Sequence, residues 1–245
     1  MPDIQALTTP ADVANAAVLD AVATLSIAIQ ERGQATWVLA GGSSPMAAYQ
    51  QLVHEYADVL DWSKVTIIMG DERLVPMDDP DSNWGQISTV LLGTGLTASM
   101  AQIRPETELS VEEAARRYET ALRRLPVDDA GVPYFDLVWL GVGEDGHTLS
   151  LFPGHSDFVP TEQLVIPVYN SPKPPATRIT LTLRALESTS RAIIFAVGAG
   201  KKAALAEALE EGKLPIAQAA LRIEQYGGYV TWLFDRDATT LDPAD

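Results

Sequence analysis

The segment Thr36-Trp37-Val38-Leu39-Ala40-Gly41-Gly42-Ser43-Ser44-Pro45 decides the fold class. A short apolar, β-type run leads directly into two glycines, two serines and a proline. This is the order of a buried strand, a tight turn and the first turn of a helix. Comparable apolar runs begin at Val65, Phe135, Arg191 and Tyr229, and helical patterns separate them. The alternation predicts an α/β fold, with a mostly parallel sheet flanked by helices.

The region before this segment predicts a helix over residues 10–31. Thr9 can cap it, with Pro10 in its first turn and Asp12 three residues from the cap, and Gly33 stands where the helix would stop. No apolar run comes near the roughly 18–20 residues of a membrane span, and the chain start lacks the basic and apolar regions of a signal peptide. We therefore expect a soluble, cytoplasmic protein with no membrane partner.

The composition excludes several partners and chemistries. The 245 residues include 33 Asp and Glu against 17 Lys and Arg, a formal net charge of −16, so nucleic acid is not expected as a partner. Without cysteine there is no thiolate metal site, disulfide or thiol nucleophile. We expect one domain over residues 1–245, in which the proline-rich residues 171–175 form a rigid loop rather than a linker.

Polar residues follow three of the apolar runs, and ligands in open α/β sheets bind beyond the carboxyl ends of strands. After the first run, residues 36–40, the segment Gly41-Gly42-Ser43-Ser44-Pro45 would let the backbone and a helix N-terminus approach a phosphate. The same residues also fit a plain glycine turn with Ser44 as the helix cap, and both interpretations stay open. The polar residues after the second run are Asp71-Glu72-Arg73, and taken alone they fit a surface ion-pair cluster.

The segment after the third run, which begins at Phe135, contains a formal G-x-G-x-x-G at Gly141, Gly143 and Gly146. Glu144 and Asp145 would lie where a pyrophosphate has to sit, and the motif comes late in the chain, which disfavours dinucleotide binding. A tight loop that presents Asp145 beside His147 fits better, because a carboxylate can fix the tautomer of an imidazole and raise its basicity. The pattern predicts a general base. His54 and His155 lack such neighbours in the sequence.

Cations further along the chain are candidates for holding a phosphate. Arg178 opens an alternating run, and Lys201 follows Gly198-Ala199-Gly200 at a strand-to-helix junction. This junction is no Walker A loop, because Phe195 replaces its first glycine and Lys202 its Ser or Thr. Four arginines among glutamates on a helix instead predict a solvated face: Arg116, Arg117, Arg123 and Arg124.

In their order and spacing, these motifs resemble the 6-phosphogluconolactonase family over nearly the whole chain. The resemblance implies a Rossmann-like α/β domain, shared with glucosamine-6-phosphate deaminase. It also implies hydrolysis of 6-phosphoglucono-1,5-lactone in the pentose phosphate pathway, without metal or organic cofactor. It rests on residues 41–45, 70–76 with Ser82-Asn83, 141–153, 171–175 with 178–182, the Lys201 segment, and Trp232 with Asp235.

The resemblance further implies a role for each site residue. His147 would act as general base on water, with Asp145 as its orienting partner. Arg73 would stabilise charge near the lactone carboxyl, and Asp71 would place Arg73 or the sugar hydroxyls. The phosphate would be held by Gly41, Gly42, Ser43, Arg178 and Lys201, with Lys173 and Lys202 in reserve.

Two positions depart from the family pattern. Leu149 stands where the family commonly has a small residue, and Gly200 where an acidic residue is common before the lysine. The second departure leaves open whether Lys201 or Lys202 reaches the phosphate. We also expect Arg73, Arg178 and Lys201 to converge in one cleft inside the acidic protein.

Two other functions compete with lactone hydrolysis. In glucosamine-6-phosphate deaminase, a tyrosine follows the Asp-Glu pair, and a glutamate lies five residues after the motif histidine. Arg73 and Phe152 occupy these places here. A non-catalytic sugar-phosphate sensor on the same fold normally carries a DNA-binding segment, for which this chain leaves no room. The small-molecule substrate is therefore the expected partner of a monomer or small homo-oligomer.

Overall fold

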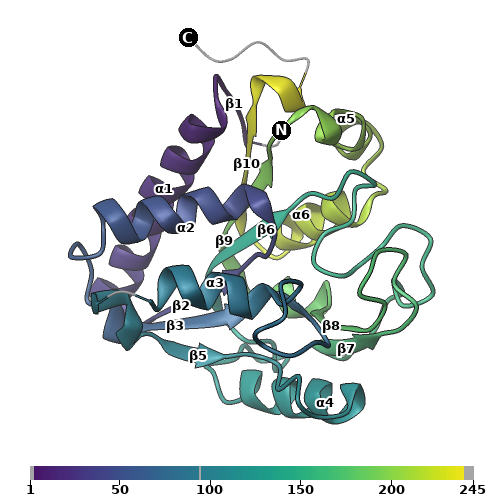
Figure 1. The fold of residues 1–245 in the computed structure, drawn as a ribbon, viewed down its shortest axis with the longest axis horizontal. Coiled ribbons are helices and arrows are strands. Elements are labelled where there is room, and N and C mark those ends of the chain that lie inside the picture. The colour runs from purple at the N-terminus through teal and green to yellow at the C-terminus, as the bar shows by residue number, and fades with distance from the viewer. Residues whose placement is uncertain (1–2, 94, 240–245) are drawn as a thin grey trace.

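A seven-stranded sheet runs through the computed structural model, which describes residues 3–93 and 95–239 (Figure 1). The strand order is β1-β10-β9-β6-β2-β3-β5, and every neighbouring pair is parallel. The predicted α/β fold is confirmed, although residues 1–2, 94 and 240–245 of the predicted domain lie outside the described residues. The strands of this sheet are β1 Asp3–Leu7, β2 Ala35–Leu39, β3 Val65–Met69, β5 Ala101–Ile103, β6 Phe135–Gly141, β9 Thr189–Ala196 and β10 Tyr229–Asp235.

Helices cover both faces of this sheet. One face packs against α1, α2 and α3, and the other against α4, α5 and α6. Under the first face, the rings of Trp37, Tyr49, Trp139 and Phe195 form an aromatic cluster, with adjacent centroids 4.8–5.7 Å apart. The helices are α1 Pro10–Arg32, α2 Ser43–Glu55, α3 Asn83–Leu91, α4 Val111–Leu122, α5 Lys202–Glu211 and α6 Pro215–Gln225.

The ends of α1 follow from the local sequence, as predicted. The Thr9 hydroxyl accepts from the backbone N–H of Asp12, and the Asp12 carboxylate accepts from the backbone N–H of Thr9. Gly33 closes the helix with φ +76°. By length and composition alone, α1 is long and apolar enough to cross a membrane, with a mean hydropathy of 1.6. In this fold, α1 is a core helix. Seven of its residues are buried, and Asp20 pairs with Arg191 of the sheet.

The start of α2 differs from the expected cap. Gly42, with φ +93°, occupies the cap position, and the helix begins at Ser43 rather than after Ser44. Only a residue that tolerates positive φ suits this turn. Helix α4 has Ser110 as its cap, whose hydroxyl accepts from the backbone N–H of Glu113, and it ends at Leu122. On the predicted exposed face, Arg116, Arg117 and Arg123 pair with glutamates, namely Glu106, Glu113 and Glu119.

A second sheet, which the sequence patterns did not predict, lies beside the first. Its antiparallel strands are ordered β4-β8-β7, and residues 171–175 lie in the connection from β7 to β8. Gly70 joins the two sheets, because its N–H donates to Leu39 O and its carbonyl accepts from Leu181 N. The strands are β4 Asp71–Arg73, β7 Val165–Val168 and β8 Arg178–Leu181.

Gly70 cannot carry a larger side chain without a local shift. A Cβ atom there would lie 2.7 Å from Leu149 Cδ2 and 3.0 Å from Leu39 O. We predict that Gly70→Ala lowers the free energy of unfolding by about 1–3 kcal/mol, because it overpacks this junction. In a Leu149→Ala background the same change should cost less, since one of the two close contacts is gone. Urea unfolding of the four proteins measures this, and an equal cost in both backgrounds would contradict the packing account.

Candidate active site

A pocket of about 300 Å³ lies where β2, β4, β6 and β8 meet the starts of α2 and η4 (Ala199–Lys201). Eight of the nine predicted site residues line it, and the ninth, Asp145, contacts the lining residue His147. Of the two reserve lysines, Lys173 lines the pocket and Lys202 does not. The expected convergence of Arg73, Arg178 and Lys201 is thus present in the fold. Lining residues that the site prediction missed are Ala40, Ser44, Pro45, Asn83, Gly141, Val142, Gly143, Glu144 and Leu149.

His147 and Asp145 form a close pair in the loop after β6. The distance from His147 Nδ1 to Asp145 Oδ1 is 2.5 Å. Gly143 N donates to His147 O, which folds the loop back on itself. A Cβ atom at Gly143 would lie 1.9 Å from His147 Nδ1 and 2.5 Å from Asp145 Oδ1. This glycine of the formal G-x-G-x-x-G therefore leaves room for a His–Asp pair, which agrees with the rejection of a dinucleotide site.

The imidazole of His147 is mostly buried against an aromatic ring. Its centroid lies 4.5 Å from that of Phe152, which is itself fully buried. Burial lowers the pKa of His147 below its ordinary value, although the hydrogen bond and charge of Asp145 oppose this. For Asp145, burial would raise the pKa, but the contact with His147 and the charge of Lys173 bring it below the ordinary value. The pair thus favours a neutral imidazole beside a carboxylate.

Asp71 and Arg178 lie on neighbouring strands of the small sheet and share one partner. Ser150 Oγ donates to Asp71 Oδ2 at 2.6 Å, and Arg178 Nη1 donates to Ser150 Oγ at 3.4 Å. Three further N–H groups of Arg178, on Nε and Nη2, donate to the carbonyl oxygens of residues 173–175, at 2.9–3.1 Å. Most of the donors of this buried guanidinium therefore hold the loop in place. The sequence patterns indicated that Arg178 holds the phosphate and did not predict these bonds to the loop.

Glu72 holds the segment that carries Arg73. Its carboxylate is 1% exposed and accepts the backbone N–H groups of Arg73, Asn83 and Trp84, together with the hydroxyl of Ser82. Burial raises the pKa of Glu72, although these hydrogen bonds oppose the change. A carboxylate in this place suits the N-terminus of α3. Glu72 is thus part of the framework of the site, not of the surface cluster that the sequence alone favoured.

Arg73 and Asn83 face the pocket from this framework. Arg73 Nη1 donates to Asp81 O at 2.7 Å, and its buried Nε has no hydrogen-bond partner among the described residues. Asn83 Nδ2 donates to Asp71 O at 3.1 Å. A Cβ atom at Gly41 would lie 2.2 Å from Asn83 Oδ1, so this glycine makes room for the amide. Ser82-Asn83 is part of the family resemblance in the sequence, so this motif could have identified Asn83 as a site residue.

The N-terminus of α2 opens into the pocket. No side chain of the described residues caps it, and Gly42, Ser43, Ser44 and Pro45 all line the cavity. Lys201 approaches from η4. Burial lowers the pKa of Lys201, and the nearby Glu144 opposes this. A free helix N-terminus beside a lysine is suited to an anion such as phosphate.

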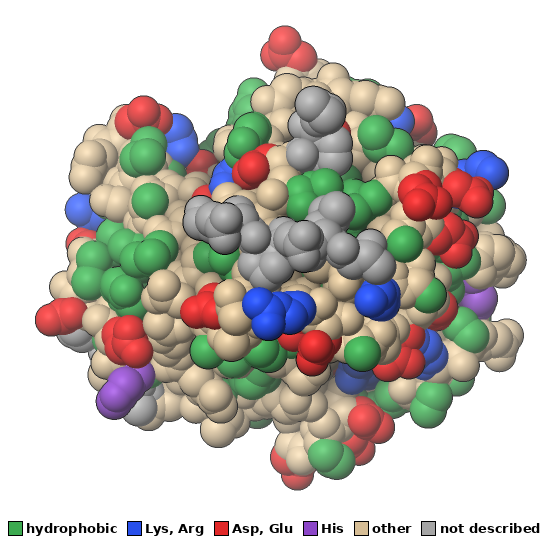
Figure 2. Space-filling model, turned by 90° about the horizontal axis from the view of Figure 1, so that it is seen from above, with side chains coloured by type: hydrophobic (Ala, Val, Ile, Leu, Met, Phe, Trp, Pro, Cys, Tyr) green, Lys and Arg blue, Asp and Glu red, His purple; other side chains and the backbone are tan. Residues whose placement is uncertain are grey.

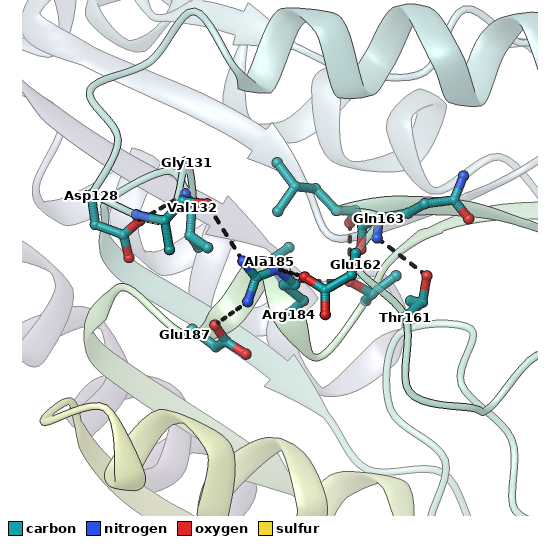
Figure 3. Close-up of polar contacts among 12 residues, drawn as sticks. Asp128, Gly131, Val132, Thr161, Glu162, Gln163, Arg184, Ala185 and Glu187 are labelled. Carbon is teal, nitrogen blue, oxygen red and sulfur yellow. Dashed lines mark hydrogen bonds and ion pairs between the residues drawn. The ribbon is translucent and has the colours of Figure 1, made fainter.

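A larger cavity of about 630 Å³ lies at the small sheet, but its arginines are already neutralised. Arg184 pairs with Glu162 and with Glu187, which is 1% exposed (Figure 3). Arg222 pairs with Glu187 as well. His155, expected to lack an acidic neighbour, lies 3.5 Å from the Asp157 carboxylate and lines neither cavity. The smaller pocket is therefore the better candidate, because it combines a base, cations and a free helix N-terminus.

Charged side chains of both signs are mixed on one outer face of the protein, where lysine and arginine are interspersed with acidic residues (Figure 2). In the pocket, by contrast, four cationic side chains converge: Arg73, Lys173, Arg178 and Lys201. Arg73 and Arg178 lie opposite each other in the register of the neighbouring strands β4 and β8. Like charges held this close raise the local potential for an anionic ligand.

Comparison with known proteins identifies the family. The model of the glucosamine-6-phosphate isomerases/6-phosphogluconolactonase family matches residues 8–232. The chain belongs to this family. It is similar to rat 6-phosphogluconolactonase, with 38% identity over 86% of this chain and 81% of the rat protein. The solved 6-phosphogluconolactonase of Trypanosoma brucei has 28% identity and a TM-score of 0.83, and 97% of each chain is covered.

The fold alone does not separate the two activities of the family. A monomeric glucosamine-6-phosphate deaminase matches 96% of this chain and 98% of its own at a TM-score of 0.75, with 22% identity. At that identity the likeness concerns the fold only. The choice of activity therefore depends on the relatives at higher identity and on the residues of the pocket.

Gly143 offers a direct test of the His–Asp pair. We predict that Gly143→Ala lowers the activity of this family member by about 100-fold or more, because the new methyl group displaces the pair and removes general-base catalysis. Gly141→Ala is the matched control, since the Cβ there would meet only Gly41 O, at 3.8 Å. Initial rates and circular dichroism would be measured for both. Equal activity of the two folded variants would contradict this assignment.

Proposed function

We propose that the protein is a 6-phosphogluconolactonase, which hydrolyses 6-phosphoglucono-1,5-lactone to 6-phosphogluconate in the pentose phosphate pathway. The observation that carries the proposal is the His147–Asp145 pair, which faces the same pocket as Arg73 and a free helix N-terminus. Opening a lactone needs an activated water, a positive group for the oxyanion and an anchor for the phosphate. We also propose that this occurs in the cytoplasm.

In this proposal, His147 activates the water. With one proton on Nδ1 donated to Asp145, its Nε2 accepts a proton from water as the oxygen attacks the lactone carbonyl. Arg73 stabilises the oxyanion with the donors that Asp81 O leaves free. When the ring C–O bond breaks, the imidazolium returns its proton to the departing ring oxygen. The product is a carboxylic acid that ionises in solution, and His147 is again neutral.

Asp71 and the α2 end of the pocket would position the substrate. Asp71 accepts from Ser150 and leaves carboxylate oxygen lone pairs for sugar hydroxyl groups. The backbone N–H groups at Gly42 and Ser43, with Lys201, take the phosphate. Lys201 rather than Lys202 is the lysine proposed for this role, because only Lys201 lines the pocket.

The deaminase alternative lacks a proton carrier at a key place. Phe152 occupies the position where the resemblance expects a glutamate in that enzyme, and its ring packs on His147. Isomerisation has to move protons between neighbouring carbons, which a phenyl ring cannot do. This contact favours hydrolysis over deamination.

The proposed activity is tested by acid release from 6-phosphogluconolactone at mildly acidic pH, where spontaneous hydrolysis is slow. We predict that the purified protein accelerates this reaction and that His147→Asn lowers kcat by about 100-fold or more. Lys201→Met should chiefly raise KM, provided that phosphate binding is uniform along the reaction. Turnover of glucosamine 6-phosphate without acid release would overturn the proposal.

The pH dependence of the reaction follows from the state of His147. The base has to be neutral, and burial lowers the pKa of His147 below its ordinary 6.5. We predict that kcat/KM is constant at neutral pH and falls on the acid side only below pH 6.5, as His147 gains a proton. Rates between about pH 5 and 7.5 would check this. A fall that begins above pH 6.5 would be the wrong sign for a buried neutral base.

A further inference from the structure

The loop of residues 171–175 brings a lysine to the catalytic pair. Lys173 Nζ lies 3.3 Å from Asp145 Oδ1, the same oxygen that contacts His147 Nδ1. The lysine side chain is 41% exposed and lines the pocket. One carboxylate oxygen therefore has two partners, an imidazole and an ammonium group.

The backbone around Lys173 is fixed on both sides. Ser171 Oγ donates to the carbonyl of Lys173 at 2.9 Å, and Ser171 N donates to Ala176 O at 2.9 Å. Arg178 Nη2 donates to the same Lys173 carbonyl at 2.9 Å, and Arg178 also takes the carbonyls of the two following prolines. Such a clamped loop delivers the lysine with little loss of backbone entropy.

We infer that Lys173 is a positioning residue, which holds Asp145 and balances its charge so that His147 remains a neutral base. The effect of Lys173 on the reaction rests on the proposed hydrolytic function. The contacts that join Lys173, Asp145 and His147 do not depend on that function. Without a counter-charge, Asp145 would favour the imidazolium form, which cannot take a proton from water. Lys173 therefore acts on the reaction through Asp145.

Other charges face His147 from several elements. Among them, Asp71 favours its protonated form and Lys173 disfavours it, and this opposition supports the inference. The charged groups around the imidazole are Glu144 and Asp145 from its own loop, Asp71 and Arg73 from β4, Arg178 from β8, Lys201 from η4 and Lys173 from the clamped loop.

The inference is tested first without any substrate. The chain has three histidines, so the His147 imidazole signals can be assigned by their loss in His147→Asn and titrated by NMR. We expect Lys173→Met to raise the pKa of His147. Lys64→Met is the matched control, because this exposed lysine also pairs with an aspartate, Asp61, but lies at the opposite ends of the strands. An unchanged His147 titration in Lys173→Met would overturn the inference.

The second measurement is the rate at two pH values. Lys173→Met should lose about threefold more kcat at pH 6 than at pH 7.5, because more of His147 is then protonated at the lower pH. Lys173→Arg should largely restore the profile. If Lys173 instead binds the phosphate, Lys173→Met will raise KM alike at both pH values and leave the NMR titration unchanged, which refutes the inference. Absence of lactonase activity in the unmodified protein would refute the proposed function, while the NMR result would still decide the role of Lys173.

Discussion

The buried guanidinium of Arg178 is the interaction on which the site most depends. Only 3% of this residue is exposed, and its donors reach three carbonyl oxygens of residues 173–175 and the hydroxyl of Ser150. Ser150 in turn donates to Asp71. A single side chain thus joins the small sheet, the lysine-bearing loop and the segment that follows His147. Loss of this buried guanidinium would leave several acceptors unpaired, at a cost of about 1–3 kcal/mol for each buried group left unsatisfied.

Close approach of a neighbouring side chain explains three of the glycines around the pocket. Gly41 leaves space for Asn83, Gly70 for Leu149, and Gly143 for the His147–Asp145 pair. Leu149, where the family commonly has a small residue, has a positive φ of 54° and fills the space beside Gly70. The two positions are therefore coupled, and the larger side chain is accommodated because its neighbour has none.

The parts of the structure that follow local rules could be predicted from the sequence. Residues 65–69 and 135–140 are mostly apolar and mostly buried, and Thr9 and Gly33 mark the ends of α1 by their capping chemistry. The small sheet could not be found in this way. Its strand β4 is the polar triplet Asp71–Arg73, which forms a strand only through its pairing with β8.

The candidate site was predicted in its composition but not in its connections. Motif order brought eight of the nine predicted residues to one pocket. The contact of Lys173 with Asp145 joins two loops that lie 28 residues apart in the sequence. Glu72 accepts mostly backbone N–H groups, which any sequence provides. The engagement of Arg178 by carbonyl oxygens was invisible for the same reason, because backbone acceptors carry no sequence signature.

Calorimetric titration with 6-phosphogluconate tests most directly the central claim, that this one pocket holds a sugar phosphate beside a general base. The account predicts one site per chain, with gluconate binding about tenfold or more weakly, because it lacks the phosphate that the α2 N-terminus and Lys201 would hold. It also predicts that Lys201→Met removes most of this difference. Equal affinity for the two acids, or a difference that persists in Lys201→Met, would contradict the account.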